Sequence, residues 1–490
     1  MKSGRRRVFL TGATGYMGRA GLDALLERED RFEIVALVLP TANDRRIMAP
    51  YLKQGVEVVW GDLTRYEDVL AGVRGADVVL HVGGMVSPLA DAHPKRTMKV
   101  NVGAAKNLVR AIHAQPEPDR IRLVYIGSVA QTGNRPAPIH WGRVGDPIKI
   151  SVFDTYAWSK TIAERIVIDS GLPTWVSLRQ TGIARLSAAD SLDPIMFHTP
   201  LDGVLEWITA RDSGVLLANV SEEDVPKNFW RHVYNIGGGK PNRLTNLEYF
   251  ERMLSAIGVK DPRCVVEPHW FAQRNFHGHW FSDSDRLEEM LSFRTQTLDE
   301  YLSEEAERLP WSVKLGSLFP QLIRRRFERI ALGPGGTLNW LAESDEPRIK
   351  AFFKSELSLS PTRGWEEVTK SRPSAKPSLL DHAYDESRAR STITRREIQA
   401  AARFRGGECF SDEYDGDWRT ILRWRCHAGH EFNASLNLVL MAGHWCPTCI
   451  GNPLSYPDLA RHSPFFNQVW APDDSAQDRT GDEVTGRRSS

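Results

Sequence analysis

The chain has 490 residues and a mass of 55.3 kDa, which is more than one ordinary hydrophobic core holds, so two or more domains are expected. Its 63 Lys and Arg residues against 62 Asp and Glu residues give a formal charge of +1, which excludes a global electrostatic attraction to nucleic acid or to an anionic membrane. Apolar runs reach nowhere near the roughly 18 residues of a membrane span, and the N-terminus does not read as a secretion signal, so no membrane partner is expected.

Short β-branched apolar runs alternate with amphipathic stretches from Val8 to about Leu178. This alternation is typical of an α/β fold with a doubly wound parallel sheet, in which helices cover both faces. The predicted strands are Val8–Leu10, Ile34–Leu39, Val56–Val59, Val78–His81, Leu123–Ile126 and Trp175–Leu178.

A glycine-rich turn, Thr11–Gly18, directly follows the first predicted strand and precedes the helix-like segment Arg19–Glu27. Gly12 permits the tight turn, Gly15 lets the backbone approach a pyrophosphate, and Gly18 allows close helix packing. The helix N-terminus then faces the anion. This context predicts a dinucleotide site rather than a plain β–α turn.

The choice between NAD and NADP depends on the end of the second strand. An acidic residue there favours NAD, whereas a nearby arginine accommodates the 2′-phosphate of NADP. This chain has Leu39-Pro40-Thr41 at that point, followed by Asp44, Arg45 and Arg46. The missing acid and the two arginines favour NADP, and NAD stays open because both arginines also suit a solvated helix face.

Three residues form a candidate proton-transfer device. Tyr156 and Lys160 are four apart on a predicted helix and share one face, where an ammonium can lower the phenol pKa from about 10 towards neutrality. Ser128 follows the strand Leu123–Ile126, at the carboxyl edge where α/β sheets place their chemistry. We expect Tyr156 to act as general acid/base and Ser128 to bind a substrate oxygen, with turn capping as the structural alternative for Ser128.

Over roughly residues 5–330 these motifs resemble the extended short-chain dehydrogenase/reductase family, the epimerase/dehydratase type. The motifs that carry the resemblance are Thr-Gly-x-x-Gly-x-x-Gly, Asp62-Leu63, His81-Val82-Gly83-Gly84, Asn101-Val102, Ser128 and Tyr156-x-x-x-Lys160. The resemblance implies a Rossmann fold, adenine contacts from Asp62 and Leu63, and Lys160 on the nicotinamide ribose. Gln180 stands where the family usually has proline, a departure beside the nicotinamide.

The resulting set of expected cofactor-binding residues combines the glycine turn, the strand ends and the catalytic helix. It comprises Gly12, Thr14, Gly15, Tyr16, Met17, Gly18, Arg45, Asp62, Leu63, Gly83, Gly84, Tyr156, Lys160, Gln180 and Gly182.

The rest of the chain divides by composition. Residues 1–330 form the expected catalytic unit, with about 1–186 mainly dinucleotide-binding and about 187–330 a substrate lobe that includes the strand-like Tyr234–Ile236. Residues 331–395 are rich in Gly, Pro, Ser and charge and read as an extension or linker. Part of it is expected to pack, through Trp340, Phe352, Phe353 and Trp365. Residues 453–490 form a tail, polar and disordered from Ala471.

The cysteines point to a metal module at residues 396–452. Cys426, His430, Cys446 and Cys449 form a C-x3-H and a C-x2-C pair, which suits tetrahedral zinc, with Cys409 or His427 as reserve ligand. Four protein ligands leave no open position, so the Zn²⁺ is expected to be structural. This cysteine distribution suits a reducing compartment, the cytoplasm, and the weaker alternative is a redox dithiol. The segment from about 405 to 450 resembles small zinc-ribbon or treble-clef modules.

The charge of this module argues against nucleic acid as a partner. Between Arg403 and Cys449 there are five arginines, no lysine and six acidic residues, about −1 in sum. We therefore expect the module to be a structural cap, a dimer element or a lid over the catalytic domain. The protein is expected to be a homodimer.

The expected function is an NAD(P)-dependent oxidoreductase or epimerase that acts on a small-molecule carbonyl or alcohol by hydride transfer. The alternative is a non-catalytic dinucleotide-sensing scaffold whose zinc module binds a partner or nucleic acid, although a sensor has no need of Ser128, Tyr156 and Lys160 together. A dehydratase usually has a carboxylate near the site. Here Gln131 and Thr132 follow Ser128, which weakens the assignment as a dehydratase.

Overall fold

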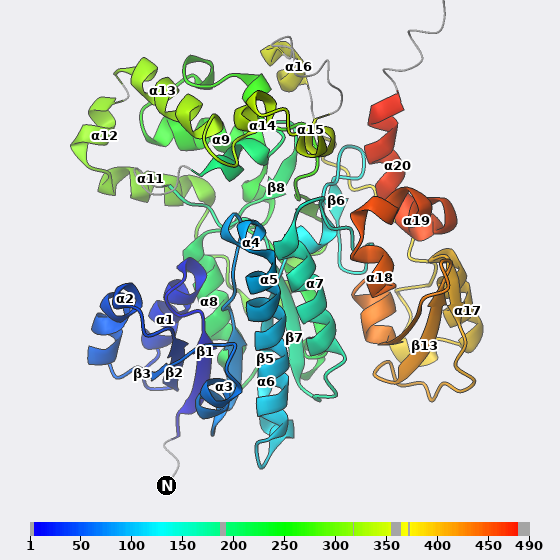
Figure 1. Ribbon diagram of the computed structural model, residues 1–490. Coiled ribbons are helices and arrows are strands. Elements are labelled where there is room, and N and C mark those ends of the chain that lie inside the picture. The colour runs from blue at the N-terminus through cyan, green and yellow to red at the C-terminus, as the bar shows by residue number, and fades with distance from the viewer. Residues whose placement is uncertain (1–3, 187–192, 317, 354–363, 371–372, 479–490) are drawn as a thin grey trace, which may run out of the picture.

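A seven-stranded parallel sheet forms the centre of the catalytic unit (Figure 1). The computed structural model describes residues 4–186, 193–316, 318–353, 364–370 and 373–478; the predicted disorder of residues 479–490 lies outside them. In spatial order the strands are β3 (Glu57–Trp60), β2 (Phe32–Val38), β1 (Arg6–Thr11), β4 (Val78–His81), β5 (Arg122–Ser128), β7 (Trp175–Gln180) and β9 (His232–Ile236).

Both faces of this sheet are buried, as parallel strands require. Side chains alternate along β1, so that Val8 and Leu10 join one apolar cluster and Phe9 joins the other. The first face is covered by α1 (Tyr16–Leu26), α2 (Ala42–Lys53), α8 (Ala210–Ser221) and α10 (Asp285–Leu291). The second is covered by α3 (Tyr66–Val73), α6 (Gly103–His113) and α7 (Thr155–Ile168).

The six predicted strands are confirmed, each with ends shifted by no more than two residues. The assignment of Tyr234–Ile236 to the substrate lobe is wrong, because β9 pairs in parallel with β7 in the main sheet. Helix α8 also belongs to the sheet layer and packs on α1, where a Cβ on Gly21 would lie 2.6 Å from Leu217 Cδ1. The chain thus returns to the dinucleotide unit after residue 187.

A mainly helical lobe lies above the sheet in Figure 1. It contains two small two-stranded sheets, β8 (Val204–Glu206) with β10 (Arg243–Thr245) and β6 (Trp141–Gly142) with β11 (Trp280–Phe281). Its helices are α9 (Asn246–Ala256), α11 (Leu298–Arg308), α12 (Trp311–Gly316), α13 (Pro320–Ala331), α14 (Thr337–Ala342), α15 (Glu346–Phe352) and α16 (Trp365–Lys370). The expected packing of the extension is confirmed, since Trp340, Phe352 and Phe353 are buried and Trp365 is partly buried.

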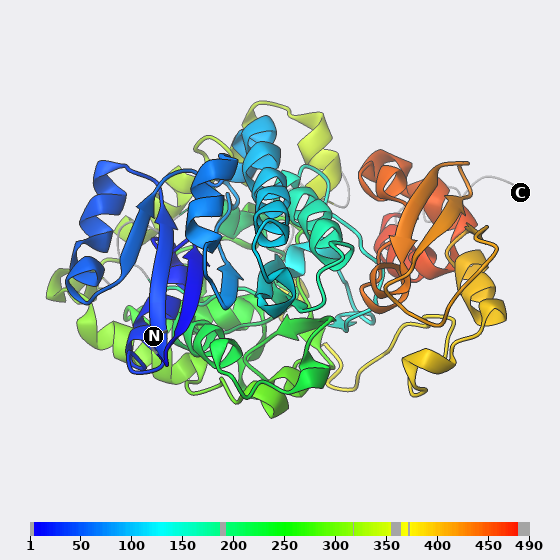
Figure 2. The same ribbon diagram turned by 90° about the horizontal axis from the view of Figure 1, so that it is seen from below.

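The C-terminal module lies beside α7 at one side of the catalytic unit (Figure 2). It consists of β12 (Gly407–Cys409), β13 (Ile421–Cys426) and β14 (Glu431–Ser435) in an antiparallel sheet, with α17 (Arg395–Phe404), α18 (Pro447–Ile450), α19 (Tyr456–His462) and α20 (Pro464–Asp478). Helix α20 continues past Ala471, where the sequence predicts disorder. Throughout the described segments, no helix is both long enough and apolar enough to cross a membrane.

Candidate functional site

A cleft of about 830 Å³ opens at the carboxyl ends of the central strands. The strands are in register there: Thr11 of β1 faces His81 of β4, and Ser128 of β5 faces Gln180 of β7. Loops that follow these strands line the cleft, as is usual for ligand sites of open α/β sheets. With the exception of Arg45, every cofactor-binding residue expected from the sequence lines it.

The glycine turn at the floor of the cleft requires glycine at two positions. Gly12 has φ +78°, and a Cβ there would lie 2.6 Å from both Cα and N of Gly83, so the loops after β1 and β4 touch. A Cβ on Gly18 would collide with the carbonyl oxygen of Gly12. The Gly83 amide donates to Thr11 Oγ1 over 3.1 Å, which ties the loops together. This bare-backbone cradle at the start of α1 suits a pyrophosphate.

The end of β2 differs from the expectation for NADP. Leu39 and Asp44 line the cleft, and the Asp44 carboxylate accepts a 2.6 Å hydrogen bond from Thr41 Oγ1. The Arg45 guanidinium instead stacks on the Trp60 ring, 4.4 Å from its centroid. The charge that faces the cleft here is therefore negative.

The three expected catalytic residues come together at one point of the cleft. Ser128 ends β5, while Tyr156 and Lys160 lie one turn apart on α7. Ser128 lies close enough to the Tyr156 phenol for its side chain to lower the phenol pKa. Lys160 is buried and its Nζ donates to the carbonyl oxygen of Ile126 over 2.8 Å. Ser128 also caps the short helical turn Val129–Thr132, accepting from the Ala130 amide, so its capping role and its place in the cleft coexist.

Burial sets the protonation of Tyr156 and Lys160. It raises the pKa of Tyr156 to about 12, against the effect of the Ser128 side chain, and it lowers the pKa of Lys160 to about 8, against the charge of Glu164. The expectation that Lys160 draws the phenol pKa towards neutrality is not met, because Nζ lies 6.0 Å from the ring centroid and burial raises the phenol pKa. These pKa values leave the Tyr156 phenol protonated beside a charged Lys160 at neutral pH.

Glu164 lies one turn beyond Lys160 on α7 and is completely buried. Burial alone would raise its pKa, but the Arg179 guanidinium and hydrogen bonds from His444 and Arg179 hold that pKa well below its usual range. Arg179 Nη2 donates to Glu164 Oε2 over 2.7 Å. Sequence reasoning missed Glu164, although its i+4 spacing from Lys160 was a usable signal.

Apolar and polar side chains both line the cleft beyond the glycine turn. Met85, Val86, Val129 and Ile183 supply apolar surface, and Arg96, Lys99, Thr181 and His277 line the same cleft. Two histidines that do not line the cleft have other partners: His279 Nε2 lies 2.6 Å from Thr132 Oγ1, and His140 Nε2 lies 2.9 Å from the Ser374 carbonyl oxygen. Asn101 holds the loop after β4, donating to the Met85 carbonyl oxygen and to Ser159 Oγ.

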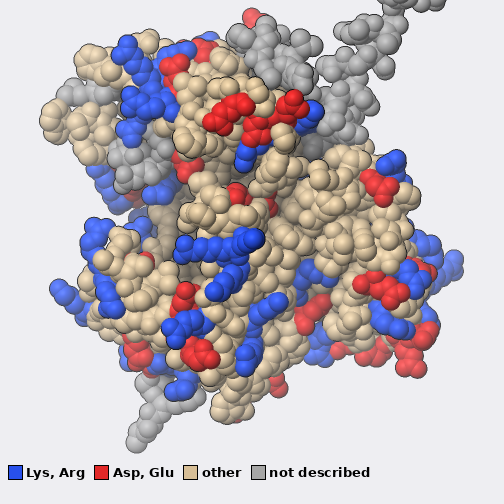
Figure 3. Space-filling view, viewed as in Figure 1, with Lys and Arg blue, Asp and Glu red and all other residues tan. Residues whose placement is uncertain are grey.

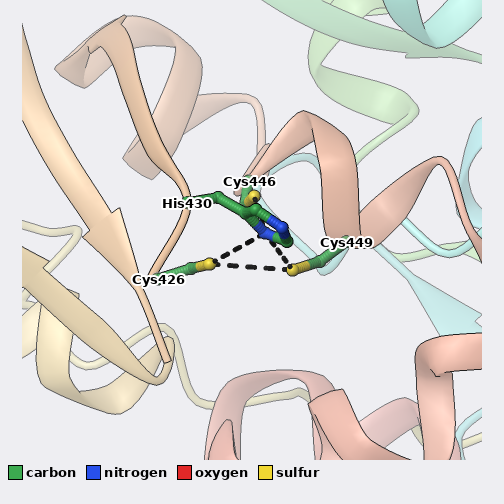
Figure 4. Close-up of side chains that lie close together, drawn as sticks. All are labelled: Cys426, His430, Cys446 and Cys449. Carbon is green, nitrogen blue, oxygen red and sulfur yellow. Dashed lines mark hydrogen bonds between the residues drawn. The ribbon is translucent and has the colours of Figure 1, made fainter. Parts of the chain in front are cut away.

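The four expected metal ligands also come together (Figure 4). His430 Nδ1 lies 3.4 Å from Cys426 Sγ, 3.6 Å from Cys446 Sγ and 3.4 Å from Cys449 Sγ. The Sγ atoms of Cys426 and Cys449 are 3.7 Å apart. A tetrahedron with bonds of about 2.3 Å to sulfur and about 2.0 Å to nitrogen has edges of about 3.8 and 3.5 Å, which these distances match.

The knuckle geometry supports this cluster. Gly429, with φ +79°, turns the chain between Cys426 and His430, and the Gly429 amide donates to the Cys426 carbonyl oxygen. The reserve ligands lie elsewhere: Cys409 pairs with Trp424 in the sheet, and His427 Nε2 lies 3.1 Å from Asp458 Oδ2. On the face shown in Figure 3, acidic and basic side chains are interspersed over the module.

The fold and the cleft define a Rossmann-type dinucleotide-binding unit. Residues 8–172, about a third of the chain, match the NAD dependent epimerase/dehydratase family. The sequence resemblance is thereby confirmed over this segment.

Relatives of known activity agree with this family. The chain is 31% identical over 188 residues to 3 beta-hydroxysteroid dehydrogenase type 7 of Mus musculus, covering 36% of this chain and 49% of the relative. It is 30% identical over 191 residues to the 3-beta-hydroxysteroid dehydrogenase of Mycolicibacterium neoaurum, covering 36% and 47%. A Stigmatella aurantiaca ketoreductase is 27% identical over 173 residues, covering 35% and 48%. The chain thus matches about half the length of these relatives.

Solved structures share the fold. A dTDP-glucose 4,6-dehydratase double mutant from Streptomyces venezuelae, with NAD and DAU bound, has a TM-score of 0.50 at 21% identity, over 62% of this chain and 96% of that one. The Bordetella bronchiseptica enzyme WbmG, in complex with NAD and UDP, has a TM-score of 0.50 at 19% identity, over 64% and 96%.

Proposed function

We propose that the protein is an NAD-dependent oxidoreductase that interconverts a secondary alcohol and a ketone on an apolar small molecule. The observation that carries this proposal is the meeting of Ser128, Tyr156 and Lys160 at the carboxyl edge of the sheet, inside a cleft whose floor is a glycine cradle. A dinucleotide sensor has no need of a serine, a partly buried tyrosine and a buried lysine together in the cleft. The hydroxysteroid dehydrogenase relatives support the same reaction class.

The residues of the chain divide the work of carbonyl reduction. NADH, when bound, supplies the hydride to the carbonyl carbon. Tyr156 gives its phenolic proton to the carbonyl oxygen, and Ser128 donates a hydrogen bond that orients that oxygen. Lys160 supplies a positive charge on the same side of the cleft, which offsets part of the negative charge that proton transfer leaves on Tyr156. Alcohol oxidation is the reverse step and requires Tyr156 to lose its proton first, so a phenol pKa of about 12 favours carbonyl reduction at neutral pH.

The walls of the cleft support an apolar substrate. Met85, Val86, Val129 and Ile183 give hydrocarbon surface to the cleft that holds the catalytic trio, which favours a ring or chain that carries one hydroxyl or keto group. Arg96 and Lys99 line the same cleft and suit an anionic group of the cofactor or the substrate. Hydroxysteroids, the substrates named by two of the relatives, are the first class to examine.

NAD rather than NADP is the proposed cofactor, which revises the expectation from the sequence. Asp44 lines the cleft at the end of β2, where its carboxylate suits a ribose hydroxyl and repels a 2′-phosphate. Arg45 is engaged on Trp60, and Arg46 Nη2 donates to Asn43 Oδ1 over 2.9 Å. Both cations are thus occupied on the helix surface.

A structural zinc ion in the C-terminal module completes the proposal. Cys426, His430, Cys446 and Cys449 supply four ligand atoms, so the ion has no position for substrate. The ion would hold the turn after β13 against the start of α18, close to the contact between the module and the catalytic unit.

A homodimer is also part of the proposal. Large apolar side chains are exposed around the start of α12 and of α13, namely Trp311, Leu318, Phe319 and Leu322. Contiguous exposed apolar surface commonly marks an interface. Light scattering should give twice the chain mass of 55.3 kDa, and a monomer at micromolar concentration contradicts the dimer.

Turnover of a defined panel tests the activity. The wild type, with NAD⁺, is screened against a 3β-hydroxysteroid, long-chain secondary alcohols and dTDP-glucose, and NADH is followed by absorbance. Tyr156→Phe should lower kcat at least about a hundredfold on any substrate found, while NADH binding stays within about twofold. Tyr51→Phe is the matched control, because Tyr51 bonds Asp23 outside the cleft. Substantial turnover by Tyr156→Phe contradicts the assignment.

A further inference from the structure

A chain of buried hydrogen bonds runs from the C-terminal module to the catalytic serine. His444 Nε2 lies 2.8 Å from Glu164 Oε2, and Gln131 Nε2 donates to the same oxygen over 2.8 Å. Gln131 Oε1 in turn accepts the backbone amide of Ser128 over 2.8 Å. His444, Glu164 and Gln131 are each at most 1% exposed. One continuous path therefore joins residues that are 316 positions apart in sequence, from 128 to 444.

The loop that carries His444 is fixed to the catalytic unit by its backbone. Gly443 has φ +77°, and a Cβ there would collide with the carbonyl oxygen of Asp146, in the loop before α7. Arg179 Nη2 donates to the Ala442 carbonyl oxygen over 2.7 Å, and Arg165 Nη1 donates to that of Trp445 over 3.0 Å. The loop is thus inserted into the catalytic unit immediately before the metal-ligand candidate Cys446.

The charge of Glu164 fixes which atom donates and which accepts in each hydrogen bond of this path. Because Glu164 is ionised, its oxygens only accept, so each neighbour must present a donor. Gln131 therefore turns its NH2 group to Glu164 and its carbonyl oxygen to the Ser128 amide. If His444 is removed, Glu164 Oε2 keeps Arg179 Nη2 and Gln131 Nε2 as donors but loses the one that comes from the C-terminal module, so the carboxylate that holds the Gln131 amide is less constrained.

We propose that the C-terminal module completes the active site and that His444 is a positioning residue, which holds Ser128 in place through Glu164 and Gln131. This inference rests on the proposed function for its catalytic consequence, and on geometry alone for its structural one. Removal of His444 should loosen the turn after β5, so that Ser128 orients the substrate oxygen less well. Cofactor binding should not change, because none of the three path residues lines the cleft.

The test uses full-length variants with one matched docking control. His444→Ala breaks the path, and His444→Gln restores a donor to Glu164. Asp169→Ala removes another contact between the module and α7, the 2.5 Å hydrogen bond from Ser435 Oγ, without touching the path. Gln131→Met breaks the path inside the catalytic unit, and it leaves the module intact if His444→Ala impairs folding.

Hydrogen–deuterium exchange of segment 127–133 is the first readout, because it needs no substrate. His444→Ala and Gln131→Met should speed its exchange about tenfold, the effect of one lost buried hydrogen bond, while His444→Gln and Asp169→Ala stay near wild type. The double variant His444→Ala/Gln131→Met should exchange as fast as either single variant, because both substitutions break the same chain of hydrogen bonds. Unchanged exchange in His444→Ala, equal acceleration in Asp169→Ala, or independent effects in the double variant would overturn the proposal.

Kinetics provide the second readout on whichever substrate the panel identifies. His444→Ala should lower kcat about tenfold with the Kd of NADH within about twofold, and His444→Gln should recover most of the loss. A change in exchange without any turnover by the wild type leaves the positioning role standing and rejects the oxidoreductase activity. A change in kcat without a change in exchange rejects the positioning role.

Discussion

Replacement of Glu164 by glutamine tests the buried hydrogen bonds and the ion pair that lie one helical turn beyond Lys160. The Glu164 carboxylate accepts from Ser177 Oγ over 2.6 Å, from Arg179 Nε over 3.1 Å and from Gln131 Nε2 over 2.8 Å, besides the contacts with Arg179 Nη2 and His444. A glutamine side chain has one accepting oxygen and one NH2 group. Its NH2 group would therefore face at least one of these donors. It also removes the charge that compensates buried Arg179.

The magnitude follows from the burial of the Glu164–Arg179 pair, whose side chains are 0% and 1% exposed. Loss of one partner of a fully buried ion pair costs about 3–5 kcal/mol, and Glu164→Gln should lower the free energy of unfolding by that order. The exposed pair of Arg7 with Glu57, whose carboxylate side chain is 57% exposed, supplies the control: Glu57→Gln should cost less than about 1 kcal/mol.

Urea unfolding followed by tryptophan fluorescence measures both variants. The difference between wild type and Glu164→Gln should also depend on pH with a defined sign. Because the folded pKa of Glu164 is depressed, its contribution is fully present above the usual Glu pKa of about 4.3 and declines as pH falls below it. A cost below about 1 kcal/mol at pH 7, or a cost that grows on acidification, would refute this reasoning.

Three further predictions address the cofactor, the metal and the lysine. Asp44→Ala should raise the Kd of NADH and lower the ratio of the NADPH Kd to the NADH Kd, as measured by fluorescence titration. A wild-type protein that binds NADPH more tightly than NADH contradicts the NAD proposal. Cys446→Ser should release about one zinc per chain, whereas Cys264→Ser, at an exposed free cysteine, should release none, as measured by elemental analysis. Carbonyl reduction should slow as pH rises through about 8, where Lys160 loses its charge, and a flat profile to about pH 10 would exclude that role.

Local patterns in the sequence predict the dinucleotide half of the molecule well. Alternating apolar runs locate the central strands, and the glycine turn fixes where a cofactor can lie, since both signals come from neighbouring residues. Strand β9 escapes this reasoning because membership of a sheet depends on pairing with β7, more than fifty residues earlier. Arg45 illustrates the same limit, since a charge near the cleft does not reveal that its side chain stacks on Trp60.

The role of the module could be predicted only in part. The spacing of Cys426, His430, Cys446 and Cys449 shows that they can share one ion, and the structure brings them together. Their position against α7 follows from apolar packing: Leu438 and Leu440 share one buried cluster with residues of the Rossmann sheet. Such non-directional contacts leave no spacing signal, so the hydrogen bond of His444 with Glu164 emerges only in three dimensions.

Transfer of deuterium tests the central claim most directly. NADH that carries deuterium at the transferable C4 position is incubated with the wild-type protein and the ketone that corresponds to an active alcohol of the panel. The mass of the product alcohol is then measured by mass spectrometry. We expect one deuterium in the wild-type product, and at least about a hundredfold slower product formation by Tyr156→Phe at equal NADH occupancy. Unlabelled product, or an unchanged rate in Tyr156→Phe, would contradict hydride transfer with Tyr156 as the proton donor.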